Sequence, residues 1–438
     1  MSTGHSHGGG AVPDPSSRRA RLVTAVAAAV LACTAVGLVI AFWPGEVEDN
    51  GAYQPFDVDL FDARVSDATP AECPGTPAED QPEAEVQCLT LELTLENGPN
   101  AGDTATLNYV QVPGAAQLEE GDEIVVGYSP NADPEFRYYF ADFQRQTPLI
   151  LLGILFVVAV LLLARFGGFR ALLGAGASLV VIVVFLIPAL LEGTSPILIA
   201  LVASSLIAVL ALYLTHGVNH RTNVAFIGTM ASLGLIAVLA AIFVAATHLT
   251  GLADEDVVYL QLANGDIDVT GLLLAGIVIG ALGVLDDVTV TQVSAVWEIH
   301  AADPTVHART LYQSAIRIGR DHIASTVNTL VLAYTGAALP LLLLFQQGHR
   351  PLGQVLTGEA IATEIVRALV GSIGLVASVP ITTGLAVAVV GARRGGADAD
   401  HGDHEPPDPP DPEPTEEEPP PPPPPTSWDD FQPQEQAF

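Results

Sequence analysis

The chain has 438 residues, of which 50% are hydrophobic and only 15% are charged, a balance typical of an integral membrane protein rather than a soluble domain. The formal net charge of -33 belongs to polar regions, because 22 of the 49 acidic residues lie in residues 44–146 and 13 lie from Asp398 onward. All 16 basic residues are arginine and they form no large cluster, so we expect no nucleic-acid partner.

The N-terminal region combines a polar head with one apolar run. Residues 1–20 are rich in Gly, Ser and His, which predicts a disordered head. The apolar run over residues 22–42 is longer than the core of a signal peptide, which has about 7–15 residues. It is also long enough to cross a hydrocarbon layer of about 30 Å. We therefore predict an uncleaved transmembrane anchor over residues 21–43, with the N-terminus in the cytosol.

Residues 44–146 predict a small β domain. Leu89, Leu91, Leu93 and Leu95 alternate with Thr or Glu, which is the period-two pattern of a half-buried strand. About five such strands, joined by tight turns, favour an antiparallel sandwich or barrel. If this domain lies outside the cytosol, its oxidising surroundings permit a disulfide between Cys73 and Cys88.

The rest of the chain predicts a seven-helix transmembrane domain over residues 147–392, so the first anchor makes about eight transmembrane helices in all. The positive-inside rule places both termini in the cytosol, because 11 arginines then lie inside and five outside. Residues 393–438 predict a disordered, acidic, proline-rich cytosolic tail. The seven apolar runs cover residues 148–165, 170–190, 196–215, 224–248, 269–296, 322–345 and 366–391.

Two adjacent acids interrupt the fifth of these seven runs, and acidic side chains are costly inside a bilayer. Asp286 and Asp287 fall in its cytosolic half, about 20 residues after the run begins. Thr291, Ser294 and Glu298 follow Asp287 at steps of four, three and four, which places them on one helix face. Lipid cannot satisfy such a stripe, so we expect it to face the bundle interior, a cavity or another polar helix.

The next apolar run carries a second polar stripe, because Asp321, Ser325 and Asn328 are spaced by four and three residues. His322, Ser325 and Thr329 form an overlapping stripe. We expect two antiparallel neighbours with such stripes to enclose a polar site, in which an arginine near Asp286 and Asp287 neutralises them. The β-branched run over residues 288–291 favours a bent or broken helix, a feature of ion and substrate sites in transporters. The alternative is a polar pair that only orders the bundle.

Other candidate sites are weaker. His216 and His220 have the i,i+4 spacing of metal ligands, but a metal site needs a third or fourth ligand. The sequence contains no nucleophile elbow, P-loop or HExxH motif, so we expect neither an enzyme nor a resident cofactor. The absence of lysine and the many Ala, Gly and Pro residues favour a bacterial source.

Three segments resemble the YibE/F family of bacterial multi-pass membrane proteins. They read GALGVLDDVTVTQVSAVWE, GRDHIASTVNTLVLAYTGAALPLLLL and GVNHRTNVAFIGT, and the resemblance extends over roughly residues 50–392. It implies a protein of the bacterial plasma membrane and supplies no substrate. It marks as signature positions Asp286, Asp287, Thr289, Thr291, Gln292, Arg320, Asp321, His322, Asn328 and Thr329.

Two hypotheses follow. In the first, the protein is a transporter or permease of an ion or small solute, and the two aspartates respond to a cation or proton. Arg320 or His322 then acts as counter-charge or proton partner. In the second, the protein is a non-transporting envelope scaffold whose β domain binds a protein partner. The first hypothesis takes neutral ligands from Thr291, Gln292, Ser294 and Asn328.

Overall fold

The computed structural model describes most of the region between the predicted head and tail. The tail over residues 393–438 lies outside the described residues, and so do residues 1–15 of the head. Cys73 also lies outside them, so its predicted pairing with Cys88, which is a bonded cysteine, stays a prediction. The described residues are 16–45, 59–71, 87–111, 114, 116–130, 132–133, 137–253, 255–263, 267–347 and 351–391.

The β domain is one five-stranded antiparallel sheet with strand order β3-β2-β1-β4-β5. The predicted alternation in β2 is confirmed, because Leu91, Leu93 and Leu95 are buried in the domain core. The strands are β1 (Asp59–Ala71), β2 (Gln87–Leu95), β3 (Thr104–Gln111), β4 (Glu123–Tyr128) and β5 (Tyr138–Phe143).

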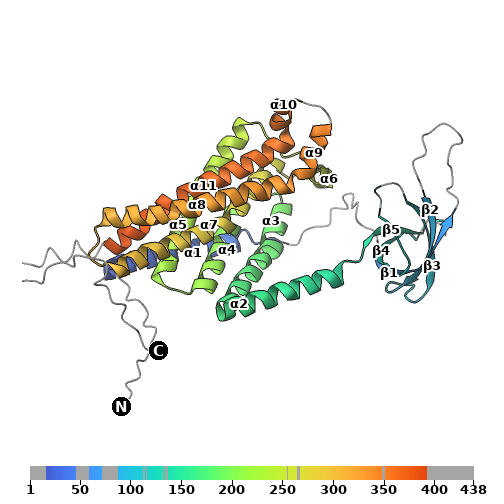
Figure 1. Ribbon diagram of the computed structural model, residues 1–438, viewed down its shortest axis with the longest axis horizontal. Helices are drawn as coiled ribbons and strands as arrows, with labels where there is room; N and C mark the ends of the chain where they lie inside the picture. Colours follow the sequence, from blue (N-terminus) through green and yellow to red (C-terminus); the bar gives the residue numbers. More distant parts are fainter. Residues whose placement is uncertain are drawn as a thin grey trace, which may run out of the picture. The chain divides into compact units, whose positions relative to one another are not determined.

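The sheet curls until its two edge strands approach each other. Tyr109 of β3 and Phe140 of β5 make an edge-to-face contact with ring centroids 5.5 Å apart. Such a contact adds to the area that the rings bury and closes the sheet around its leucine core. Of the two predicted shapes, sandwich and barrel, the curled sheet is closer to a small barrel (Figure 1).

The remaining described elements are helical, as the apolar runs predict (Figure 1). Their caps agree with the local sequence, since Ser17 caps the first helix and Asn219 caps α5. The helices are α1 (Arg18–Ala41), α2 (Gln146–Val181), the π-helical turn η2 (Ile182–Leu186), α3 (Ile187–Leu191), α4 (Pro196–His216), α5 (His220–Ala246), α6 (Glu255–Ala263), α7 (Val269–Ala302), α8 (Ala308–Ala337), α9 (Leu339–Gln347), α10 (Leu352–Thr357) and α11 (Glu359–Gly391).

Six of the described helical segments are long and apolar enough to cross a membrane, namely α1, the continuous Gln146–Leu191 segment, α4, α5, α7 and α11. The Gln146–Leu191 segment contains a sharp kink at Arg165, where φ is 52° and ψ is -127°. The predicted spans 148–165 and 170–190 lie on either side of this kink. The predicted span 322–345 is divided between α8 and α9. Eight separate crossings therefore stay a prediction.

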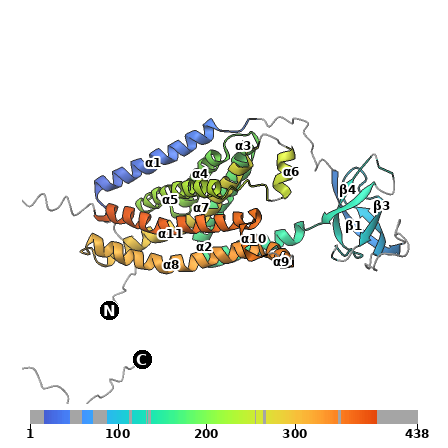
Figure 2. The same cartoon turned by 90° about the horizontal axis from the view of Figure 1, so that it is seen from above.

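The centre of the bundle is formed by α5, α7 and α11, which all pack against one another. Helix α8 lies along one edge, beside α7 and α11, while α1 lies on the opposite edge, beside α4 and α5 (Figure 2). Helix α7 is continuous through the β-branched run, so the predicted break is wrong. Apolar packing on three sides compensates for the low helix propensity of these residues.

Glycines allow α5 and α11 to approach closely. A side chain at Gly374 of α11 would overlap Ile236, and a Cβ atom at Gly228 of α5 would lie 2.6 Å from Oγ1 of Thr382. Small residues at helix contacts are the usual means of close packing in membranes. The approach brings the polar residues of the two helices into the same layer.

Candidate functional site

The two adjacent aspartates of α7 have different surroundings. Successive side chains of an α-helix point about 100° apart, so Asp286 and Asp287 cannot face the same neighbour. Asp286 is half-buried beside α5, whereas the Asp287 side chain is 73% exposed. The interior site therefore belongs to Asp286.

Asp286 lies within a layer of hydroxyl groups. Its Oδ1 atom is buried and has no hydrogen-bond partner among the described residues. The hydroxyl of Thr229 on α5 interacts with the carboxylate. That same hydroxyl lies 2.8 Å from the hydroxyl of Thr289, which in turn donates to the backbone carbonyl oxygen of Asp286 at 3.2 Å. One short chain of polar atoms thus joins α5 to α7.

Helix α11 adds further hydroxyl groups to the same interface. The side chains of Ser378, Thr382 and Thr383 are fully buried. Within the described part of the chain, Oγ1 of Thr382 and Oγ1 of Thr383 make no hydrogen bond. Unpaired buried hydroxyls are uncommon, because each one forfeits its interactions with water. Each of these two hydroxyl groups can donate one hydrogen bond and accept others.

The residues that α5 and α11 contribute were not predicted from the sequence. The available signal was the polar content of two otherwise apolar spans, in the segments FIGTMAS and SVPITTG. Single hydroxyl residues in a membrane helix more often bond to their own backbone, as Ser232 does with the carbonyl of Gly228. Only the packing of three helices shows that Thr229, Thr289 and Thr382 belong together.

Gln292 is part of the same inner face, but it connects α7 to α8. Its Nε2 atom donates to the carbonyl oxygen of Ala315 at 2.8 Å. The contact is close because Gly319 has no side chain, and a Cβ atom there would lie 2.7 Å from Oε1 of Gln292. Gln292 was predicted to be a neutral ligand, and in the structure its amide nitrogen instead fixes α8 against α7.

The predicted stripe on α7 does lie on one face, and of the three predicted surroundings Asp287 faces a polar residue of another helix and Ser294 faces a cavity, whereas the stripe does not face the bundle interior. Asp287 and Glu298 are exposed, while Thr291 and Ser294 are half-buried. The buried face of α7 is instead occupied by Thr289, Gln292 and large apolar residues, because apolar area drives the orientation of the helix.

Each exposed acid of α7 has a basic neighbour. Oδ2 of Asp287 lies 3.6 Å from Nε2 of His322 on α8. Oε1 of Glu298 lies 3.1 Å from Nη1 of Arg221, at the start of α5. His322 is thus the neighbour of Asp287, as one of the two predicted alternatives requires, whereas Arg320 makes no ion pair within the described residues.

The predicted stripe on α8 likewise points away from α7. His322 is half-buried against Asp287, but the other members of the stripe are exposed on the outer side of α8. The two helices therefore do not enclose a site through their polar stripes, because the α7–α8 contact is mainly apolar. The exposed members of the stripe are Asp321, Ser325, Asn328 and Thr329, and Arg320 beside them is exposed as well.

The two candidate metal ligands have separate roles. Nδ1 of His220 lies 3.1 Å from the hydroxyl of Thr24 on α1. His216 lines a cavity of about 200 Å³ together with Asn219 and Ser294. In the part of the chain that the structure describes, no group of three or more His, Cys, Asp or Glu side chains is arranged to hold a metal ion.

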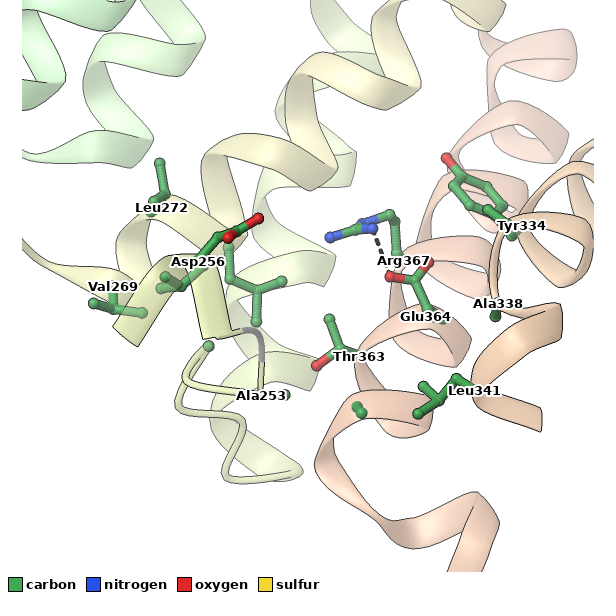
Figure 3. A pocket seen from close by; sticks show the side chains of 15 residues that line it. Ala253, Asp256, Val269, Leu272, Tyr334, Ala338, Leu341, Thr363, Glu364 and Arg367 are labelled. Carbon is green, nitrogen blue, oxygen red and sulfur yellow. Dashed lines mark hydrogen bonds and ion pairs between the residues drawn. The ribbon is translucent and has the colours of Figure 1, made fainter. Parts of the chain in front are cut away.

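A larger cavity of about 870 Å³ lies at the opposite end of the bundle, where α7 and α11 begin. Arg367 and Glu364 of α11 form an ion pair at its wall, with Nη1 and Oε1 2.7 Å apart. Figure 3 shows both side chains, with Asp256 pointing toward the cavity from the other side. Between this cavity and the level of Asp287, α7, α8 and α11 are closed by an apolar cluster that includes Val288, Val327, Leu375 and Val379.

A family model described as YibE/F-like protein matches residues 152–392, which is more than half of the chain. The chain belongs to the YibE/F-like family. The match covers α2 to α11, including both aspartates, whereas the predicted resemblance also included the β domain. The comparisons with curated proteins and with solved structures gave no match.

Proposed function

We propose that this YibE/F-like membrane protein carries a small cation, or a solute coupled to a cation or proton, and that Asp286 is the group that binds it. The observation that supports this proposal is the unpartnered Oδ1 atom of Asp286 inside the bundle. Intramembrane acids are rare and costly, and they commonly mark ion or proton pathways. An acid needed only for packing would have its lone pairs satisfied by the protein.

The chemistry of the neighbouring groups suits this role. A threonine hydroxyl both donates and accepts hydrogen bonds, so Thr229 can pair with Asp286 in its protonated or its ionised form. Carboxylate and hydroxyl oxygens are also the hard ligands that alkali and alkaline-earth cations prefer. Thr382 of α11, whose hydroxyl makes no hydrogen bond within the described residues, packs against Gly228, the neighbour of Thr229 on α5.

The proposal is supported by two cavities, one toward each end of the bundle. The cavity at Arg367 is open at one end of the bundle, and the smaller cavity at His216 is open at the other. The apolar cluster around Val288 and Val379 closes the space between α7, α8 and α11. A carrier needs a barrier of this kind, which opens only when the helices on either side move.

We further propose that the protein lies in a bacterial plasma membrane with both termini in the cytosol, as the arginine distribution predicts. The sequence contains no nucleophile elbow, P-loop or HExxH motif, so we propose no enzymatic activity. In this orientation the β domain is extracytoplasmic and available to a protein partner.

The test is cation flux in proteoliposomes under an imposed voltage or pH gradient, with H⁺, Na⁺, K⁺ and divalent cations examined in turn. Asp286→Asn removes the charge and keeps the shape, and it should abolish the flux of the wild-type protein. Asp287→Asn is the matched control, because it is the same change one residue later on the exposed face. It should retain most of the flux.

The opposite results exclude the proposal. Flux that survives in Asp286→Asn would show that the interior acid is not on the pathway. No flux with any of these cations, together with a folded and markedly less stable Asp286→Asn variant, would make the acid a structural group. The scaffold hypothesis would then be preferred, and deletion of residues 46–146 should remove binding of its partner.

A further inference from the structure

The outer side of α8 carries a regular seam with no partner in the structure. Its members follow one another at steps of three, four, three, four and three residues, and all are exposed. Such a 3–4 repeat is the pattern by which two helices pack along each other. We call this surface the α8 outer face; it consists of Ile318, Asp321, Ser325, Asn328, Leu332 and Thr335.

The α8 outer face lies at the depth of the membrane. Helix α8 runs antiparallel to α7, because Ala315 meets Gln292, His322 meets Asp287 and Tyr334 approaches Gly280. α7 is one of the six helices that are long and apolar enough to span a bilayer, so α8 shares its depth. Asn328 is six residues beyond His322, or about 9 Å deeper at about 1.5 Å per residue.

A polar face at this depth needs a polar partner. The Asn328 amide has two donor hydrogens and an acceptor oxygen, and it makes no hydrogen bond within the described residues. Lipid chains cannot satisfy it. The same polar residues explain why α8, alone among the described helices of 18 residues or more, is not apolar enough to qualify as a membrane span. Its outer face is therefore better suited to contact with protein than to contact with lipid chains.

We propose that a second copy of this chain covers the α8 outer face, in the same membrane orientation and related by a two-fold axis along the membrane normal. In such a contact each residue meets its own counterpart or a close neighbour. Asn328 of the two copies would then lie together and form the interhelical amide pair that fixes register in paired helices. Leu332 and Ile318 would pack above and below it.

The charges at the cytosolic end of this face fit a copy of itself. Arg317 and Asp321 are one helical turn apart on the exposed side of α8, and neither forms an ion pair among the described residues. Across the two-fold axis Asp321, a member of the seam, faces Asp321 of the other copy, and Arg317 of each copy lies one helical turn away. The two arginines offset the repulsion between the two carboxylates, which a surface with acidic residues alone would not do.

The neighbouring face of α7 is open to the same approach. Gly276, Gly280 and Gly283 are exposed and spaced by four and three residues. No atom lies within 4 Å of a Cβ atom placed at Gly276 or Gly283. Glycines in this spacing let a further helix approach the backbone closely. A second copy docked at α8 would therefore meet little obstruction from α7.

Cysteine cross-linking in membranes tests the proposal directly, with Cys33→Ser in the background because Cys33 is the exposed free cysteine. Ser325→Cys and Leu332→Cys should form disulfide-linked dimers on mild oxidation. Ala333→Cys is the matched control, because it is exposed but lies about 100° around the helix from Leu332. Equal cross-linking of all three would overturn the proposal, and so would cross-linking of the seam positions only to other proteins.

A mass measurement in nanodiscs gives the second test. The wild-type protein should contain two copies per particle, and Asn328→Leu should raise the dissociation constant of the dimer by about three- to tenfold. Asn328→Gln keeps the amide and should recover part of the affinity. One copy per particle for the wild type, or an unchanged dissociation constant in a folded Asn328→Leu variant, would overturn the inference. Neither test requires transport activity.

Discussion

Helix α7 has an inner side and an outer side, and similar residues have different burial and different neighbours on the two sides. On the inner side, Thr289 and Gln292 are buried and bonded to other helices, and Asp286 lies half-buried beside Thr229. On the outer side, Asp287 and Glu298 remain exposed next to basic neighbours. Consecutive residues can therefore have separate roles. The role of a residue in such a helix depends more on the helix face on which it lies than on the sequence motif that contains it.

The largest expected difference between the two sides concerns packing. Trp297→Ala should lower the free energy of unfolding by about 3–5 kcal/mol, because Trp297 is 1% exposed within the apolar cluster of α5, α7, α8 and α11. Its neighbour Glu298 lies on the outer side, so Glu298→Ala should cost about 1 kcal/mol or less. Unfolding in mixed micelles measures both variants. Similar losses would mean that α7 has no inner and outer side.

Helix α11 offers a second matched pair. Gly374→Ala should destabilise the bundle by about 1–3 kcal/mol, since a Cβ atom there would overlap Ile236 of α5. A Cβ atom at Gly371 of the same helix would have no atom within 4 Å, so Gly371→Ala should be neutral or stabilise the helix by up to about 1 kcal/mol. The same unfolding assay applies, and equal effects would show that α5 and α11 do not pack as described.

The contact between the hydroxyl groups of Thr229 and Thr289 is the next feature of the inner side that can be tested. Thr229→Val and Thr289→Val each remove one hydroxyl of the 2.8 Å contact, and a double-mutant cycle isolates the coupling. We expect a coupling energy of about 0.6 kcal/mol, the average for hydrogen bonds in membrane proteins. Strictly additive single effects would indicate that the two hydroxyl groups do not interact.

The smallest stability effect is expected at Asp287. Asp287→Asn removes an exposed pair with His322 whose closest atoms lie 3.6 Å apart, so the free energy of unfolding should change by less than about 1 kcal/mol. High salt should reduce even this difference. A loss as large as that of Trp297→Ala would place Asp287 in the interior.

Much of the fold could be predicted from the sequence, because hydrophobic periodicity and run length are local signals. The apolar runs, the alternating strand at Leu91 and the family resemblance all came from short segments. Among the described residues, six helical segments are long and apolar enough to span a membrane, whereas the eight predicted spans included α8. The polar outer face of α8 is the physical reason why this helix does not meet the same criterion.

Only part of the candidate site around Asp286 could be predicted from the sequence. Asp286 could be singled out because an acid in an apolar run is unusual by itself. The direction in which Asp287 points depends on which face of α7 buries more apolar area. This buried area depends on the contacts of α7 with α5, α8 and α11, which are distant in the sequence. The contributions of Thr229 and Thr382 could not be predicted, since isolated hydroxyls in membrane helices have no distinctive spacing.

Binding of a cation or proton by Asp286 should make the stability of the protein depend on the concentration of that ligand. The unfolding midpoint should rise with the concentration of the bound cation, by an amount equivalent to about 2.7 kcal/mol at a hundredfold excess over the dissociation constant. Asp287→Asn should show the same rise, and Asp286→Asn should show none. A rise that persists in Asp286→Asn, or no rise in the wild-type protein with any cation or pH change, would contradict this account.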